Sequence, residues 1–367
     1  MFDFCHRKEC SSDNGDKYTY FVTTPESNAI FIRKLHVCTW LYGGRKENVE
    51  VGLQFGFRKD RVDAFKSKLR DKTGNQLKIR IWASWARADF KSEEQSLYEQ
   101  ISTQEMARFL FNADCTGVKN CLEWSSCGGR ELQFGDKKLY VFPVNIHIGN
   151  GHVDLSIKIP ETYEYDQDAY VRFCTRVPCS SISLRTGFIA HKICAYNIII
   201  NQMRNAPSSP EFNSSERCEI QSAYAIHIVP TAYGQKFVDK EAFCGLRFLE
   251  AEKYTKYVEK VRCLRRRIKQ DKMIVSFNKI VPKLKTDNNT SYTFCSIFEK
   301  DFFGLAQWLW NLSFALIGAI LGCLLSFYFA SDASGFRHSA EGTKDNRGRG
   351  GEIQGVKTNE TTSANQT

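Results

Sequence analysis

Residues 48–57 have the sequence NVEVGLQFGF, and this stretch indicates the structural class of the soluble part of the chain. Its apolar side chains alternate strictly with the residues between them: Val49, Val51, Leu53, Phe55 and Phe57. A period of two places these side chains on one face of a half-buried β-strand. Another β-forming segment, residues 36–42, comes just before Gly43-Gly44. We therefore predict a β-hairpin over residues 30–58.

The same alternation recurs in three further segments, at residues 77–81, 140–148 and 153–159. Gly149-Asn150-Gly151 lies between the last two segments, so we predict a second hairpin closed by a short turn. Three later apolar segments are also predicted to be strands: residues 188–200, 221–229 and 273–281.

Apolar residues at helical spacing interrupt the strands at residues 62–69, 93–112 and 248–270. Strands and helices do not alternate regularly along the chain, which disfavours a doubly wound parallel sheet. The predicted class is therefore α+β, with mainly antiparallel β-hairpins and a few helices.

Residues 302–330 contain no charged side chain, and about 20 apolar residues are enough to cross a bilayer. Trp308 and Trp310 lie near one end of this segment and Tyr328 near the other, as is typical of membrane–water interfaces. We therefore predict one C-terminal transmembrane helix. The polar composition of residues 331–367 predicts a disordered tail.

These features predict five segments along the chain. They are an irregular N-terminus at residues 1–16, a soluble α+β body at 17–247 with an internal loop at 202–217, a basic amphipathic helix with a short strand and linker at 248–301, the transmembrane helix at 302–330, and the tail at 331–367.

The net charge of +10 is concentrated just before the predicted membrane helix. Residues 252–285 contain twelve Lys or Arg and three acidic residues. Basic side chains next to a membrane gain about 1 kcal/mol each from anionic lipid. We predict contact with anionic lipid headgroups through five side chains: Arg262, Arg265, Arg266, Arg267 and Lys269. The alternatives are a nucleic-acid site, because Tyr254 and Tyr257 lie in the same stretch, and a solvated face that only sets the topology.

Cysteine usage favours a reducing compartment. Of the 14 cysteines, Cys323 lies in the predicted membrane helix, which leaves an odd number elsewhere. A disulfide framework favours an even number, so we expect mostly thiols. Residues 1–17 contain no apolar run of the kind found in a secretory leader. We therefore expect a membrane-anchored protein whose body is cytoplasmic.

Two histidines flank the predicted turn at residues 148–151. If the hairpin closes across that turn, His147 and His152 face each other about 5 Å apart at Cβ, and Asp154 shares their face. Imidazole and carboxylate groups bind metal ions and also transfer protons. His147, His152 and Asp154 are therefore a candidate metal or acid–base site. A closed zinc site needs a fourth ligand, and a hydrated hairpin face is the simpler interpretation.

Two further patterns are less specific. Cys127 precedes a Gly-Gly-Arg sequence that could lower the pKa of a thiol, and a histidine base would make this cysteine a nucleophile. Arg172, Arg176 and Arg185 surround three serines and could hold a phosphate group. The default interpretations are a structural cysteine beside a turn and a solvated strand edge. The sequence contains neither a Walker A motif nor a GxGxxG motif.

Small residues recur every four positions within the predicted membrane helix, at Gly318, Gly322 and Ser326. Such spacing lets two helices approach closely. We therefore predict that two copies of the chain can associate through this face.

Three functional classes fit these observations, and no motif identifies a substrate or cofactor. The favoured class is a single-pass, membrane-tethered cytosolic binding or signalling module. The first alternative is a tethered enzyme that uses the His/Asp or Cys/His groups. The second is a C-terminally anchored surface glycoprotein, which would have a leader and paired cysteines.

Overall fold

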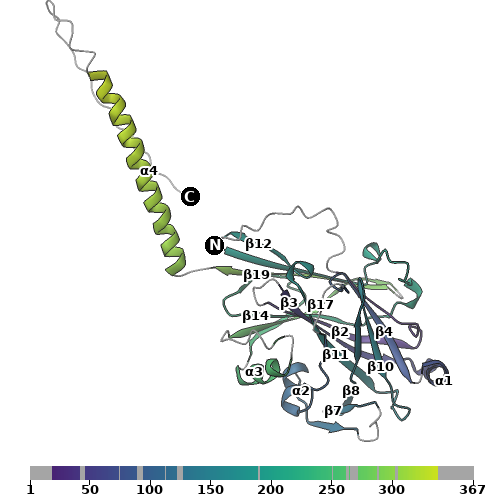
Figure 1. Cartoon of the computed structure of the whole chain (residues 1–367). Helices are drawn as coiled ribbons and strands as arrows, with labels where there is room; N and C mark the ends of the chain where they lie inside the picture. Colours follow the sequence, from purple (N-terminus) through teal and green to yellow (C-terminus); the bar gives the residue numbers. More distant parts are fainter. Residues whose placement is uncertain are drawn as a thin grey trace, which may run out of the picture. The chain divides into compact units, whose positions relative to one another are not determined.

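The alternating apolar residues build two β-sheets that share one core, as the computed structural model shows (Figure 1). The structure describes residues 19–41, 46–73, 75–88, 94–111, 113–121, 127–188, 191–249, 251–261, 264, 272–286, 289–301 and 305–337. The chain divides into two units, residues 1–302 and 303–367. The first unit is the body that contains both sheets.

Sheet A is built from strands distributed over the whole body. Its order is β15 (Gly234–Val238), β19 (Asn289–Asp301), β13 (His191–Ile200), β1 (Thr19–Thr23), β4 (Gln76–Ala83), β10 (His152–Lys158) and β9 (Asn145–Ile148). In addition, β12 (Leu184–Phe188) pairs with β13, and β18 (Pro282–Thr286) pairs with β19.

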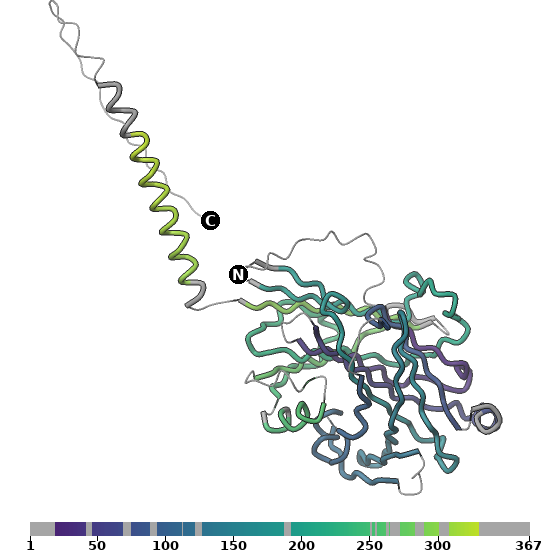
Figure 2. Tube along the Cα trace, in the orientation of Figure 1, coloured from purple at the N-terminus to yellow at the C-terminus, as the bar shows by residue number. Residues whose placement is uncertain are grey.

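Sheet B interleaves with sheet A along the sequence. Its order is β16 (Phe243–Phe248), β17 (Met273–Ile280), β14 (Ala223–Pro230), β2 (Ile30–Trp40), β3 (Lys46–Phe57), β11 (Asp168–Pro178), β8 (Lys137–Val141), β7 (Arg130–Phe134) and β6 (Gly117–Asn120), and β5 (Gln95–Ser96) pairs with β11. The path of the chain through both sheets can be followed by colour in Figure 2.

The core lies between the facing surfaces of the two sheets. In sheet B it includes the predicted alternating residues of β3, from Val49 to Phe57, and in sheet A it includes Ile79, Ile81 and Leu155. Burial of such side chains contributes about 1.5–3 kcal/mol each to folding. The alternation in the sequence therefore identifies the inward faces of these strands correctly.

Two short helices cover part of the outer face of sheet B. These are α2 (Gln104–Phe111) and α3 (Ala251–Lys260), which share a buried apolar cluster with Trp40 of β2 and Val275 of β17. A third helix, α1 (Val62–Thr73), places Phe65 against Phe57 with 5.1 Å between ring centroids. The rest of the outer face of sheet B is left without a helix among the described residues.

Both sheets are mixed, which corrects the prediction of mainly antiparallel hairpins. The β1–β13, β2–β14 and β8–β11 pairs are parallel. In each case the chain passes through the other sheet before it returns, so strands that are distant in sequence become neighbours. Such long-range pairing leaves no local signal in the sequence. The α+β content is confirmed in its coarser form: mostly strands, with few helices.

Three predicted elements differ in their bounds. Residues 140–148 are not one strand, because β8 ends in sheet B and β9 begins in sheet A. Pro143, which has no N–H to donate to a ladder, lies between them. The predicted helix at 93–112 begins only at Gln104, since Gln95–Ser96 pairs with β11. The predicted helix at 248–270 is described over Ala251–Lys260.

The second unit contains α4 (Leu305–Arg337). Within α4, Trp308–Phe329 is the one segment of the described chain that is long and apolar enough to be a candidate membrane span.

Candidate functional site

The histidine hairpin forms with a tighter turn than predicted. Gly149 N–H donates to the carbonyl of His152 at 2.9 Å, which leaves a two-residue turn in which Gly151 has φ +81°. His147 is therefore paired with Asp154 in the β9–β10 register, while His152 lies opposite Gly149. The expectation that the two imidazoles face each other across the strands is wrong, because the turn contains two residues rather than four.

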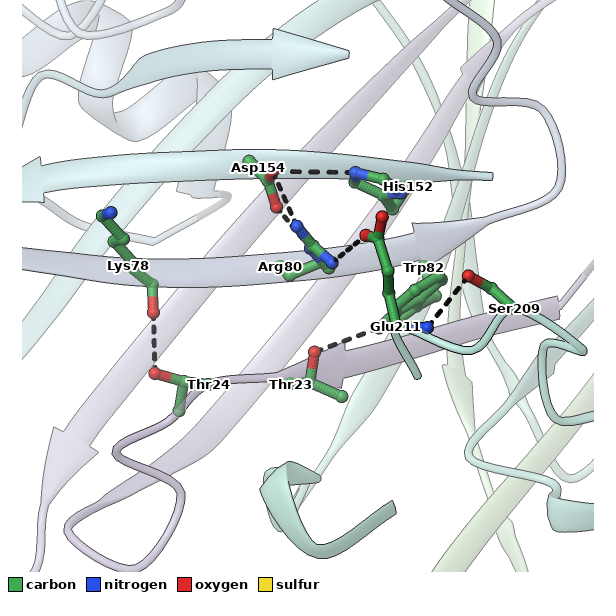
Figure 3. A network of polar contacts seen from close by, with 9 residues as sticks. All are labelled: Thr23, Thr24, Lys78, Arg80, Trp82, His152, Asp154, Ser209 and Glu211. Carbon is green, nitrogen blue, oxygen red and sulfur yellow. Dashed lines mark hydrogen bonds and ion pairs between the residues drawn. The ribbon is translucent and has the colours of Figure 1, made fainter. Parts of the chain in front are cut away.

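Arg80, Asp154 and Glu211 on this outer face of sheet A are already paired (Figure 3). Arg80 of β4 holds the Asp154 carboxylate through two hydrogen bonds, at 2.6 and 3.0 Å, and binds Glu211 through a third at 2.7 Å. His152 Nε2 lies 3.6 Å from the same Asp154 carboxylate, and the His152 ring lies 5.2 Å from that of Trp82. Asp154 is thus engaged by Arg80 rather than held open for a ligand.

The structure gives no geometric support for a metal at this hairpin. Within the described part of the chain, no three His, Cys, Asp or Glu side chains converge as a metal site would require. A cavity of about 450 Å³ does lie over His147 and Asp154. Its wall includes Glu211 and Lys78 beside Arg80, so charges of both signs line it.

The other residues singled out from the sequence are dispersed. Arg172 is buried against Glu50, and Arg185 pairs with Glu47, so these arginines do not form a joint phosphate site. The five predicted lipid-binding side chains lie outside the described residues: Arg262, Arg265, Arg266, Arg267 and Lys269. Their interaction with lipid or nucleic acid stays a prediction.

A larger pocket, which sequence analysis missed, lies over the outer face of sheet B. We call it the sheet B pocket. Its volume is about 580 Å³. The floor consists of outward-facing side chains on five strands: Lys34 and His36 of β2, Gln54 of β3, Asp168 of β11, Tyr224 and Ile226 of β14, and Phe277 of β17. The register brings them together, since Lys34 pairs with Gln54 and Ile226 with Phe277.

Three separate segments wall the pocket. The end of α2 and the residues after it supply Leu110, Phe111 and Ala113; the β7–β8 hairpin supplies Phe134, Lys137, Lys138 and Leu139; the edge strand β16 supplies Cys244, Gly245, Leu246 and Arg247. A bulge in β16 between Phe243 and Gly245 changes the pairing with β17 at this wall. Arg247 links two walls, because its Nη2 donates to the carbonyl of Phe109 in α2 at 2.9 Å.

The balance of charge in the sheet B pocket is positive. Four cations line it against one carboxylate: Lys34, Lys137, Lys138 and Arg247 against Asp168. That carboxylate is already engaged, because it accepts a hydrogen bond from Gln54 at 2.6 Å and pairs with Arg33 at 2.6 Å. Lys138 lies 3.4 Å from Glu131, whereas Lys34 and Lys137 form no ion pair within 4 Å among the described residues.

Lys34 and His36 are held in a partly dry environment. Loss of hydration is the main cause that lowers the pKa of Lys34; nearby Lys137 and Arg33 act in the same direction, and Asp168 opposes them. Loss of hydration also lowers the pKa of His36 to about 3, so its imidazole is neutral near pH 7. The His36 ring packs edge-on against Tyr224, with 5.2 Å between centroids.

A buried polar network connects sheet B with α3. The carboxylate of Glu50 accepts hydrogen bonds from Trp40 at 2.8 Å, from Tyr257 of α3 at 3.0 Å and from Arg172 at 3.0 Å. Arg172 and Glu50 form a buried ion pair within the sheet. The Tyr257 hydroxyl attaches α3 to it, and a hydrogen bond to a charged group contributes about 1.5–3 kcal/mol.

Gly52 makes room for the aromatic contact between floor and wall. A Cβ at Gly52 would collide with the hydroxyl of Tyr170. The Tyr170 ring in turn packs against Phe111 in the pocket wall, at 4.8 Å between centroids, and against His36 in the floor, at 6.1 Å. Even a methyl group at position 52 would therefore disturb both surfaces.

The sequence carried a partial signal for this pocket. Lys34, His36 and Gln54 are polar positions in the predicted hairpin, but a polar face on a half-buried strand is usually only hydrated. The walls come from residues about 100 and 200 positions further along the chain, and no local pattern connects them.

Comparison with known proteins assigns no family. No protein-family model and no curated protein matches the chain. Among solved structures, a "putative protease" from Parabacteroides distasonis matches with 7% identity and a TM-score of 0.27, over 74% of this chain and 40% of its own. An acetylcholine-binding protein (AChBP) from Capitella teleta, in complex with lobeline, matches with 10% identity and a TM-score of 0.13, over 79% and 86%. TM-scores this low do not indicate a shared fold.

Proposed function

We propose that this chain is a single-pass, membrane-tethered binding module with its body in the cytosol, and that the sheet B pocket is its ligand site. The observation that supports ligand binding is the pocket itself. A cavity of about 580 Å³ with aromatic walls and a few converging polar groups is typical of small-molecule sites. On the outer face of sheet A, by contrast, Arg80 already pairs with Asp154 and Glu211.

Two observations support the tether and the compartment. α4 contains the candidate membrane span, and the described side chains of Trp308–Phe329 are exposed, as lipid-facing side chains would be. Several body cysteines are buried thiols, as in proteins of a reducing compartment: Cys38, Cys115, Cys194 and Cys218.

Protease protection tests the topology. Protease added to intact cells that express the chain should remove only residues after α4 and leave the body intact. Permeabilised cells serve as the control, because the body should then be digested as well. Digestion of the body from outside intact cells would support the surface-glycoprotein alternative instead.

Alkylation of Cys244 tests the pocket. This thiol lines the sheet B pocket and its residue is exposed, so a bound molecule should shield it. We expect the uncharged probe N-phenyl-1-naphthylamine to slow alkylation of Cys244, measured by mass spectrometry on the full chain in lipid nanodiscs. Ala113→Trp and Leu246→Trp each narrow the pocket and should abolish the protection, whereas Ala113→Ser should retain it. If wild type shows no protection by this or any charged relative, the pocket is not a ligand site.

A further inference from the structure

We infer that the sheet B pocket takes an amphipathic anion: a small molecule with one negatively charged head and an apolar body. This inference rests on the proposed function and adds the chemical class of the ligand. Two regions of the pocket carry it, one cationic and one aromatic, and they lie within the same cavity.

The cationic region is formed by Lys34 on the floor and by Lys137 and Lys138 at the start of β8. These side chains come from strands separated by β3 and β11 in sheet B, so the fold and not the local sequence brings them to one cavity. The ammonium groups of lysines are ordinary partners of carboxylate, sulfonate and phosphate oxygens.

Among the described residues, Glu131 pairs with Lys138, whereas no carboxylate lies within ion-pair distance of Lys34 or Lys137. Asp168 is the one acidic residue that lines the pocket, and Arg33 and Gln54 already bind it. Lys34 is partly buried, and further cations lie near it. Such a charge is unfavourable in the empty pocket, and an anionic head would stabilise it by supplying the missing partner.

The aromatic region can hold the apolar body of the ligand. Phe111, Phe134 and Phe277 enter from α2, β7 and β17, and Leu246 closes the side at the edge strand. The Phe111 and Phe134 rings contact each other edge-on at 5.5 Å between centroids, so that wall is itself packed. Leu246 is 52% exposed, an apolar surface that a bound molecule would cover.

A competing interpretation is that the lysines only keep an exposed pocket soluble. Solubility alone does not require a lysine on the floor, where loss of hydration opposes its charge. Lys137 is exposed at the rim of the pocket, so solubility alone would explain its presence. Lys34 is therefore the side chain that separates the two interpretations.

The test uses two probes that differ by one anionic group. 8-Anilinonaphthalene-1-sulfonate is N-phenyl-1-naphthylamine with an added sulfonate. Protection of Cys244 in the full chain in nanodiscs gives the apparent affinity of each. Wild type and variants are compared at the same lipid concentration, so partition of a probe into the bilayer cancels. The sulfonate should bind more tightly to wild type than the neutral probe, and added salt should weaken only the sulfonate.

Lysine variants identify the head site. Lys34→Met and Lys137→Met should each weaken binding of the sulfonate about 10-fold, the loss expected for one charge-assisted contact, with little change for the neutral probe. Lys34→Arg should retain sulfonate binding. Lys158→Met, at the exposed end of β10 in the other sheet, is the matched control and should change the binding of neither probe.

The outcomes separate the two proposals. If neither probe protects Cys244 in wild type, the pocket is not a ligand site and both proposals fail. If both probes protect equally, or if the lysine variants affect both alike, the pocket binds apolar molecules without selecting an anion. That result overturns the present inference and leaves the proposed function standing.

Discussion

At the scale of single residues, His227 links the two sheets through the core. Its Nδ1 lies 2.6 Å from the Thr39 hydroxyl on β2, and its Nε2 lies 2.9 Å from the Ser296 hydroxyl on β19. Burial lowers the pKa of His227 to about 3. The imidazole is therefore neutral in the folded body above about pH 3, and it serves as a hydrogen-bonding bridge between strands of sheets A and B.

This bridge predicts a loss of stability in mild acid. The unfolded chain takes up a proton at His227 near its ordinary pKa of about 6.5, whereas the folded body takes it up only near 3. Stability is therefore fully present above about pH 6.5 and falls as the pH approaches 3. Between pH 7 and pH 5 the contribution of His227 falls by about 2 kcal/mol.

Denaturant unfolding of the body at pH 7 and pH 5 measures this linkage. His227→Gln should lower stability at pH 7 but reduce the difference between the two pH values by about 2 kcal/mol. Ser296→Ala keeps the imidazole, so it should lower stability at both pH values and leave the difference unchanged. An unaltered pH difference in His227→Gln would show that the proton is taken up elsewhere.

At the scale of elements, the loop that carries Glu211 and Phe212 is fixed on the outer face of sheet A. The Phe212 ring packs edge-on against Phe21 of β1 at 5.2 Å and against Trp82 of β4 at 5.5 Å. The neighbouring Glu211 binds Arg80, as Figure 3 shows, but its side chain is 60% exposed. Apolar burial, and not the ion pair, should therefore hold the loop.

Hydrogen exchange can separate the two contacts. Phe212→Ala should speed amide exchange over residues 202–217 several-fold, because the ring is partly buried and full burial of a Phe side chain is worth about 1.5–3 kcal/mol. Glu211→Gln removes the neighbouring charge and should change exchange only slightly, since exposed ion pairs contribute about 0–1 kcal/mol. Equal effects of the two changes would show that the ion pair holds the loop.

The elements also show what sequence alone can predict here. The alternation at Val49–Phe57 and at 77–81 predicted the correct strands and the correct buried faces. This is possible because the apolar residues of one strand face are two positions apart in the sequence. The same alternation at 140–148 did not reveal that the chain leaves sheet B and enters sheet A around Pro143. The two-residue turn at Asn150–Gly151 sets the register of the hairpin. The sequence is equally compatible with a four-residue loop, which would give a different register.

The candidate site was harder to predict from the sequence than the strands were. The sheet B pocket depends on the parallel β2–β14 pairing, on β16 at an edge, and on where α2 ends. Each is a long-range outcome of packing, and Lys34 and Lys137 stand about 100 residues apart. His147 and His152 are close in sequence and therefore predicted a site, but in the structure Asp154 of their hairpin is paired with Arg80 of β4.

At the scale of the whole molecule, we propose that the apolar helix α4 determines whether two copies of the chain associate. In α4, Gly318 and Gly322 lie about one turn apart on one face of the helix. Ser326 continues the same stripe. A groove of small residues permits close backbone contact with a second helix, so two tethered copies would present two sheet B pockets at one membrane.

Crosslinking of the full chain in membranes should show this pairing. Gly318→Leu combined with Gly322→Leu fills the groove and should reduce the crosslinked dimer sharply while the protein stays in the membrane, because close approach of the helices depends on the small residues. Ala319→Leu combined with Cys323→Leu introduces two leucines at the same spacing on a stripe about 100° around the helix, so the dimer should persist. If the dimer persists in the glycine double variant, or is lost equally in both double variants, the helices do not associate through the Gly318–Gly322 face. Loss in the glycine variant alone would assign it to this face of α4.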